Sequence, residues 1–276
     1  MPYLILSSWI IIFSYFLFLP QKAYPVDEQN KKLQMVIEAF EKNYSQKDKS
    51  QTIQKTTDAS GVKKDRKKKT SPVGMPIYTP PRRGAPVGRV AGGTRGILDE
   101  YPSLLCVITP DHTAMTIRDQ PHFFWYLREL TPYPIELTVI EDQAIYPVLE
   151  TRIRSPERPG FQDIRLADYG TYLKQDLVYK WFVTIVPDEE RRSKDILAWG
   201  AVRYIEISDE LKRRLLKFDK LTLASLYATA GIWYDAFSEI SALIEISPND
   251  LELRRIRNAL LEQINLSEIA KYGIEN

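Results

Sequence analysis

The pattern of apolar and polar positions changes partway along the chain. Between residues 82 and 207, short apolar runs are separated by turns rich in proline, aspartate and glycine. Within these runs apolar and polar positions alternate: Ile135, Leu137 and Val139 are interleaved with Glu136 and Thr138. Such alternation is typical of a strand with one buried face. Closely spaced strands predict an antiparallel, immunoglobulin-like β-sandwich over residues 82–207.

After residue 207 the apolar period becomes helical. Ser208, followed by Glu210 and Leu211, is typical of a capped helix start, and residues 208–276 predict a helical subdomain. Small, aromatic and turn residues match the spacing of one tetratricopeptide helix-turn-helix unit: Ala224, Tyr227, Gly231, Trp233, Ala236, Ile246 and Pro248. A solenoid needs about three such repeats. We therefore expect these helices to pack on the sandwich, which gives an α+β fold.

The N-terminus reads as a targeting segment. Residues 3–19 are apolar apart from three serines, which suits a signal peptide and is near the lower limit for a membrane span. We interpret residues 1–23 as a signal peptide or membrane anchor and expect export to the periplasm or cell envelope. The excess of Lys and Arg beyond residue 22 conflicts with export, because it favours a cytoplasmic C-terminal side.

Residues 24–81 predict an amphipathic helix followed by a disordered basic linker. Leu33, Val36, Ile37 and Phe40 form one apolar stripe within residues 26–44. Residues 45–81 contain few hydrophobic side chains, so they are expected to be disordered. They include a basic run made of Lys63, Lys64, Arg66, Lys67, Lys68 and Lys69. This run could contact anionic lipid head groups or serve only as a solvated spacer.

Composition adds limits on the function. The 276 residues are 44% hydrophobic, enough for a substantial core, and the formal net charge of +2 gives no overall sign of a nucleic-acid partner. Cys106 is the only cysteine, so an intrachain disulfide is impossible. Its apolar neighbours predict a buried, unreactive thiol.

Two groups of residues are candidate binding sites. The glycine-rich stretch 82–96 carries Arg82, Arg83, Arg89 and Arg95, which could hold an anion with the help of backbone N–H groups. The alternative is an extended lead strand packed closely on the sheet. Phe124, Trp125 and Tyr126 could form an exposed aromatic platform for a sugar or peptide. Alternatively, alternation sends their side chains to two covered faces, one meeting the helices and the other filling the sandwich.

No catalytic constellation is recognisable. His112 and His122 lack the spacing of metal ligands, so no metal or cofactor is predicted. No serine lies in a nucleophile elbow, and Cys106 has no evident base beside it. Two carboxylates from distant strands could still come together for acid–base catalysis, but the sequence does not indicate a particular pair.

Several of these segments together resemble a known family. They are the glycine-bearing stretches 83–89 and 91–96, the triplet Phe124-Trp125-Tyr126, the pair Trp199-Gly200 and the helical stretch 226–236. The chain resembles, over about residues 82–265, the uncharacterised family catalogued as domain of unknown function 928. The resemblance implies a mainly cyanobacterial family, commonly exported, with no assigned activity. The strand ending at Val186 lacks a cysteine associated with many members, so a disulfide of that family is not implied here.

The sequence leaves three functions open. The favoured interpretation is a non-enzymatic interaction or structural module of the cell envelope, with an envelope protein as partner. The second is a binder of carbohydrate or another small ligand that uses exposed aromatic side chains. The third is an envelope hydrolase built from non-local carboxylates.

Overall fold

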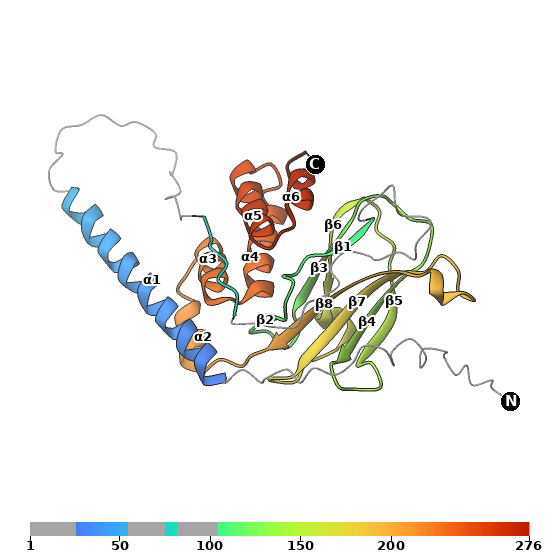
Figure 1. The fold of residues 1–276 in the computed structure, drawn as a ribbon. Coiled ribbons are helices and arrows are strands. Elements are labelled where there is room, and N and C mark those ends of the chain that lie inside the picture. The colour runs from blue at the N-terminus through green and yellow to red at the C-terminus, as the bar shows by residue number, and fades with distance from the viewer. Residues whose placement is uncertain (1–25, 55–74, 82–103, 276) are drawn as a thin grey trace.

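The structure is a computed structural model that describes residues 26–54, 75–81 and 104–275. It contains two sheets and a layer of C-terminal helices (Figure 1). The three-stranded antiparallel sheet has the order β1 (Leu105–Val107), β3 (His122–Leu127) and β6 (Gly160–Arg165). The five-stranded sheet has the order β2 (Ala114–Thr116), β8 (Ile196–Tyr204), β7 (Val178–Ile185), β4 (Ile135–Glu141) and β5 (Leu149–Ile153).

The five-stranded sheet is mixed. The β8–β7–β4–β5 part is antiparallel, whereas β2 pairs with β8 in parallel. The alternation predicted for β4 is confirmed, because Ile135, Leu137 and Val139 are buried and the residues between them are partly exposed. Short 3-10 helices, η3 (Leu166–Tyr169) and η4 (Arg192–Lys194), lie in the connections before β7 and before β8.

The two sheets meet through aromatic side chains. Phe123 of β3 stacks on Trp181 of β7 with ring centroids 4.5 Å apart and an interplanar angle of 3°. Gly200 of β8 lies directly opposite Trp181 in the register. A Cβ atom at residue 200 would stand 2.7 Å from the indole Nε1, so the missing side chain makes room for the ring. Cys106 of β1 is fully buried, as its apolar neighbours predicted.

Five helices follow the strands: α2 (Asp209–Leu215), α3 (Lys220–Ala230), α4 (Trp233–Ile246), α5 (Leu251–Gln263) and α6 (Ser267–Glu275). The predicted cap of α2 is confirmed, since the Ser208 hydroxyl accepts a hydrogen bond from Leu211 N–H at 3.3 Å. Gly231 ends α3 in the left-handed conformation with φ at +84°. Its N–H group and that of Ile232 donate to carbonyls of the last turn, which lets α4 fold back on α3.

The helical layer covers one face of the three-stranded sheet. Phe124 of β3 makes an edge-to-face contact with Phe237 of α4 at 5.0 Å, while Phe123 on the opposite face meets Trp181. The two faces of β3 are thus divided between the helices and the second sheet, as alternation predicted. Phe124, Trp125 and Tyr126 retain 6%, 1% and 5% of their surface exposed. The prediction of an exposed aromatic platform at these residues is therefore wrong, because both faces of the strand are covered.

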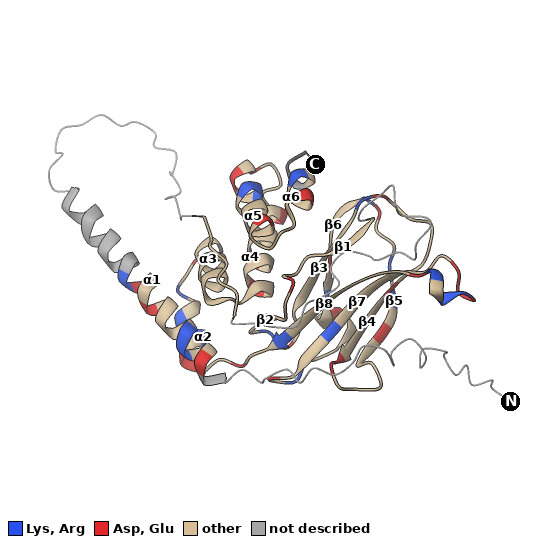
Figure 2. Ribbon diagram, in the orientation of Figure 1, with Lys and Arg blue, Asp and Glu red and all other residues tan. Residues whose placement is uncertain are grey.

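The N-terminal helix, α1 (Val26–Gln54), is longer than the predicted span 26–44 and includes residues that the pattern assigned to the linker. Its apolar stripe is buried at Leu33 and Ile37. In Figure 1 α1 runs beside α2 and then extends away from the rest of the fold. Figure 2 shows basic and acidic residues close together on α1 and α2, whereas α3 is tan along nearly its whole length. Among the described helices, none is long and apolar enough to cross a membrane.

Candidate functional site

The first residues of α4 attach the helical layer to both sheets. Trp181 Nε1 of β7 donates to the Tyr234 hydroxyl at 2.8 Å, and that hydroxyl donates to the Ala201 carbonyl of β8 at 3.1 Å. The Thr109 hydroxyl lies 3.1 Å from the same oxygen. Trp233 Nε1 donates to the Ile108 carbonyl at 3.1 Å. Burial raises the pKa of Tyr234, so its phenol stays protonated and suits a structural hydrogen-bond role.

Beside Tyr234 lies a pair of carboxylates. Asp235 and Glu239 stand one turn apart on α4, and both pair with Arg118, at 3.1 Å and 2.5 Å. Asp235 Oδ2 also accepts a hydrogen bond from Ile117 N–H at 3.1 Å. Burial, the largest influence, raises the pKa of Asp235, while Arg118 acts in the opposite direction. Both carboxylates come from one helix, so this is not the pair from distant strands that the sequence left open.

The arrangement suits packing better than acid–base catalysis. Asp235 is 1% exposed, so a substrate in solution would not reach its carboxyl group. Its oxygens already contact a guanidinium and a backbone N–H group, which leaves little capacity for proton transfer. We therefore assign Arg118, Asp235 and Glu239 to fixing α4 against the segment that follows β2 (Ala114–Thr116).

An extended segment lies on the helical layer. We call residues 75–81 the strap. Thr79 N–H donates to the Ala228 carbonyl of α3 at 3.0 Å. The side-chain amide of Gln263 of α5 makes two hydrogen bonds to the backbone of the strap. Its Oε1 accepts from Tyr78 N–H at 2.7 Å, and its Nε2 donates to the Pro76 carbonyl at 2.9 Å. The strap is thus held through its backbone, as an extended peptide is held by a receptor.

Tyr78 anchors the strap by its side chain. It is 7% exposed, makes an edge-to-face contact with Trp233 at 5.1 Å, and its hydroxyl lies 3.0 Å from His112 Nε2. A Cβ atom at residue 231 would stand 2.7 Å from the Thr79 carbonyl oxygen. Gly231 therefore serves two purposes, since it ends α3 and also leaves room for the strap.

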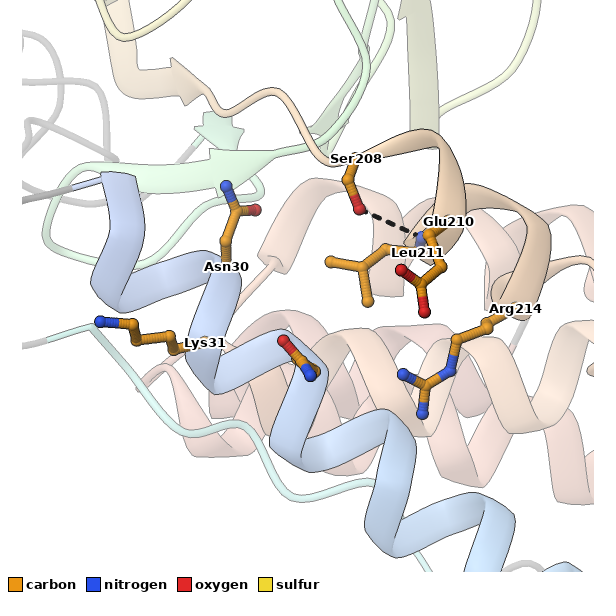
Figure 3. Close-up of a pocket in the computed structure, with 7 residues that line it drawn as sticks. Asn30, Lys31, Ser208, Glu210, Leu211 and Arg214 are labelled. Atoms are coloured by element: carbon orange, nitrogen blue, oxygen red, sulfur yellow. Dashed lines mark hydrogen bonds between the residues drawn. The ribbon is translucent and has the colours of Figure 1, made fainter.

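A cavity of about 180 Å³ lies between α1 and α2. Its lining residues are Asn30, Lys31, Gln34, Ser208, Glu210, Leu211 and Arg214. Figure 3 shows Leu211 and Arg214 projecting from α2 toward α1. The Arg214 guanidinium pairs with Glu41 of α1 at 2.7 Å. Its positive charge is thereby largely neutralised, so the cavity has no strong preference for an anion.

Some of the other predicted site residues lie outside the part of the chain that the structure describes, and the two histidines lie within it. Arg82, Arg83, Arg89 and Arg95 lie outside the described residues, and so does the basic run between Lys63 and Lys69. His112 contacts Tyr78, whereas His122 lies near Phe124, with ring centroids 6.3 Å apart. No group of three or more metal-ligating side chains is found within residues 26–54, 75–81 and 104–275.

The strap was not anticipated from the sequence, which assigned residues 75–81 to a disordered linker. A signal was nonetheless available. Prolines at 76, 80 and 81 favour an extended backbone, and Ile77 and Tyr78 are apolar side chains within an otherwise polar region. An extended, proline-rich stretch with one large aromatic residue is typical of peptides that dock on another surface.

Comparison with protein families gives one match. The model of the family described as Domain of Unknown Function (DUF928) matches residues 90–274, more than half of the chain. The match includes all of the strands and the helices from α2 to nearly the end of α6. A search among curated proteins found no match to the sequence.

Proposed function

The chain belongs to the family described as Domain of Unknown Function (DUF928), and from this premise we propose that it is a non-enzymatic interaction or structural module of the cell envelope. The family description names no activity, so the support comes from the molecule itself. The observation that carries the proposal is the strap, an extended segment bound by α3 and α5 through backbone hydrogen bonds and one buried tyrosine. A helical layer that binds an extended segment has the features of a polypeptide-binding surface.

The proposal includes a finer description of the fold. We interpret the two sheets as an immunoglobulin-like sandwich and α3 with α4 as a tetratricopeptide-like pair. The support for the pair is the glycine turn at residue 231 between two antiparallel helices with small residues, Ala224 and Ala236, buried between them. The support for the sandwich is the contact of Phe123 with Trp181 between the sheets.

We also propose that the protein is exported and attached to its membrane by residues 1–23. The apolar run at residues 3–19 supports this assignment, and the basic run between Lys63 and Lys69 would add contact with anionic lipid. A fusion of the full chain to a phosphatase that is active only outside the cytoplasm tests the assignment. We expect activity with the native N-terminus and none after deletion of residues 1–23. Activity that survives the deletion would contradict export by this segment.

A binding experiment tests the interaction function. A fluorescent peptide with the sequence of residues 75–81 is added to the full chain carrying Tyr78→Ala, which weakens the intramolecular strap. We expect this variant to bind the peptide more tightly than the wild-type chain does, because the wild-type strap occupies the same surface at high effective concentration.

The matched control is a peptide in which the tyrosine is itself replaced by alanine, and it should not bind. Circular dichroism establishes that the variant chain remains folded. If the folded variant binds neither peptide, or both equally, the helical layer does not recognise extended polypeptide and the interaction function fails.

The second function, binding of carbohydrate through exposed aromatic side chains, receives no support at Phe124, Trp125 and Tyr126, because all three are buried. The cavity between α1 and α2, at about 180 Å³, is smaller than the roughly 300–1,000 Å³ of usual ligand pockets. The hydrolase remains the weakest alternative, because Asp235 is sealed from solvent.

A further inference from the structure

Arg257 of α5 is a buried cation in an unusual environment. Only 9% of the residue is exposed, and the carbon at the centre of its guanidinium group lies 3.9 Å from the centroid of the Phe161 ring of β6. The side chain therefore lies between the helical layer and the three-stranded sheet. Burial lowers the pKa of Arg257 to about 10, with Arg254 as a second cause, yet the group still carries its charge at neutral pH.

Arg257 differs from the buried Arg203 and the partly buried Arg118 in having no acidic partner. Arg203 pairs with Asp176 at 3.4 Å, and Arg118 pairs with Asp235 and Glu239. Within residues 26–54, 75–81 and 104–275, by contrast, no carboxylate forms an ion pair with Arg257. Its Nε atom is sealed from solvent and has no hydrogen-bond partner.

This arrangement is costly for the folded chain. Buried charges are normally paired, because loss of hydration is offset only by an opposite charge and by hydrogen bonds. The contact with the Phe161 ring offsets part of that cost. It leaves the buried Nε–H group without an acceptor, and Arg254 adds a second positive charge nearby. The environment therefore lacks one negative charge with acceptor oxygens.

The next residue on α5 has the same deficiency. Asn258 is 4% exposed, and neither its amide oxygen nor its amide nitrogen has a hydrogen-bond partner. On the sheet side, Phe161 is flanked by Tyr126 at 5.3 Å, and Tyr126 stacks on Tyr272 of α6 at 6.2 Å. The buried Nε–H group of Arg257 thus lies beside aromatic rings, a combination found in sites for small organic ligands.

We propose that Arg257 is the anchor of a binding site for an organic carboxylate, at the junction of α5 with β6. A carboxylate matches the planar fork of the guanidinium with two parallel hydrogen bonds and supplies a single negative charge. The buried guanidinium of Arg257 balances the charge of a monoanion, and Arg254 adds a further positive charge nearby. The aromatic rings beside Arg257 favour a ligand with an apolar body attached to its carboxylate. This site is separate from the strap and does not depend on the proposed function.

The test uses the purified full chain and sodium benzoate as the probe. Benzoate is titrated at constant ionic strength against sodium chloride, and the Arg257 Nε–H resonance, identified by its loss in Arg257→Met, is followed by NMR. We expect that resonance to shift in a saturable manner with benzoate. The midpoint of thermal unfolding should rise with benzoate in the wild-type chain and should not respond in Arg257→Met.

Arg255→Met is the matched control, because Arg255 lies on the same helix and its side chain is exposed, 66%, beside Glu252. This variant should respond to benzoate as the wild-type chain does. No saturable shift of the wild-type resonance would overturn the proposal, and so would an unchanged benzoate response in folded Arg257→Met. A stronger response to sodium phosphate than to benzoate would overturn the choice of a carboxylate.

Discussion

The junctions that α4 and α1 make with the rest of the fold differ in how their polar groups are used. At the start of α4, Tyr234 is 1% exposed and hydrogen-bonds to both β7 and β8. At α1, the polar contacts include partly exposed ion pairs, such as Arg214 with Glu41, whose side chains are 15% and 35% exposed, and a cavity lies beside them. Only the apolar residues Leu33 and Ile37 are fully buried there.

The difference shows where polar contacts determine the fold. In a dry interior, the loss of one partner leaves the other unsatisfied, which costs about 1–3 kcal/mol. At the surface, water replaces the lost partner, and an ion pair contributes roughly 0–1 kcal/mol. We therefore expect polar substitutions to act strongly at α4 and weakly at α1.

The largest effect is expected for Trp181→Ala. This change removes a fully buried ring that stacks on Phe123, and it leaves the Tyr234 hydroxyl without its donor. The free energy of unfolding should fall by about 3–5 kcal/mol, measured by chemical denaturation. Trp199→Ala is the control, because Trp199 is partly exposed on the neighbouring strand. Equal losses for the two variants would show that the contact of Trp181 with Phe123 and Tyr234 adds no more stability than a partly exposed tryptophan does.

The second largest effect is expected for Gly231→Ala, which should disturb both the end of α3 and the strap. The left-handed backbone strains any residue with a side chain by about 1 kcal/mol, and the new Cβ would also press on the Thr79 carbonyl. We expect a total loss of about 2–3 kcal/mol. Gly170→Ala is the control, since Gly170 is also left-handed but has open space around it. If both variants lose the same amount, the strap does not rest on Gly231.

A smaller effect is expected for Tyr234→Phe. The ring remains, but Trp181 Nε1 and the Ala201 carbonyl lose their partner in the interior. Stability should fall by about 2 kcal/mol. Tyr272→Phe, at a partly exposed ring that contacts Tyr126 and Arg128, should change stability by less than about 0.5 kcal/mol. Equal losses of stability in the two variants would show that the buried hydroxyl of Tyr234 contributes no more than the hydroxyl of Tyr272.

The smallest effect is expected for Arg214→Met at the α1 junction, about 0.5 kcal/mol. The hydrogen bond with Arg214 lowers the pKa of Glu41 in the folded state. The contribution of this pair is therefore present at neutral pH and is lost as the pH falls through the lowered pKa. The stability difference between wild type and variant, measured from neutral to acidic pH, should shrink toward zero. A loss above about 2 kcal/mol would show that α1 is held as firmly as α4.

The local elements of this fold could be predicted, because their signals lie within a few residues of one another. Alternation around Leu137 identified β4, Ser208 identified the start of α2, and Gly231 identified the turn between α3 and α4. Placement of the aromatic residues of β3 was less certain. Alternation assigned them to two faces, but only the packed structure shows that both faces are covered.

The remaining features depend on residues that are far apart in the chain. Tyr78 and Gln263 are separated by 185 positions, and no local pattern links them. The parallel pairing of β2 with β8 likewise joins distant segments. Arg257 was overlooked because an arginine within a helix looks solvated in sequence, and the absence of an acidic partner becomes visible only in three dimensions.

The single cysteine provides a natural probe of how this fold opens. Because Cys106 is fully buried in β1, a thiol reagent can modify it only while the surrounding layers are apart. No competing thiol exists in the sequence, so the modification rate measures how often that interior becomes accessible in the otherwise native protein. The rate at which the Cys106 thiol is modified thus reports how often the layers around β1 separate.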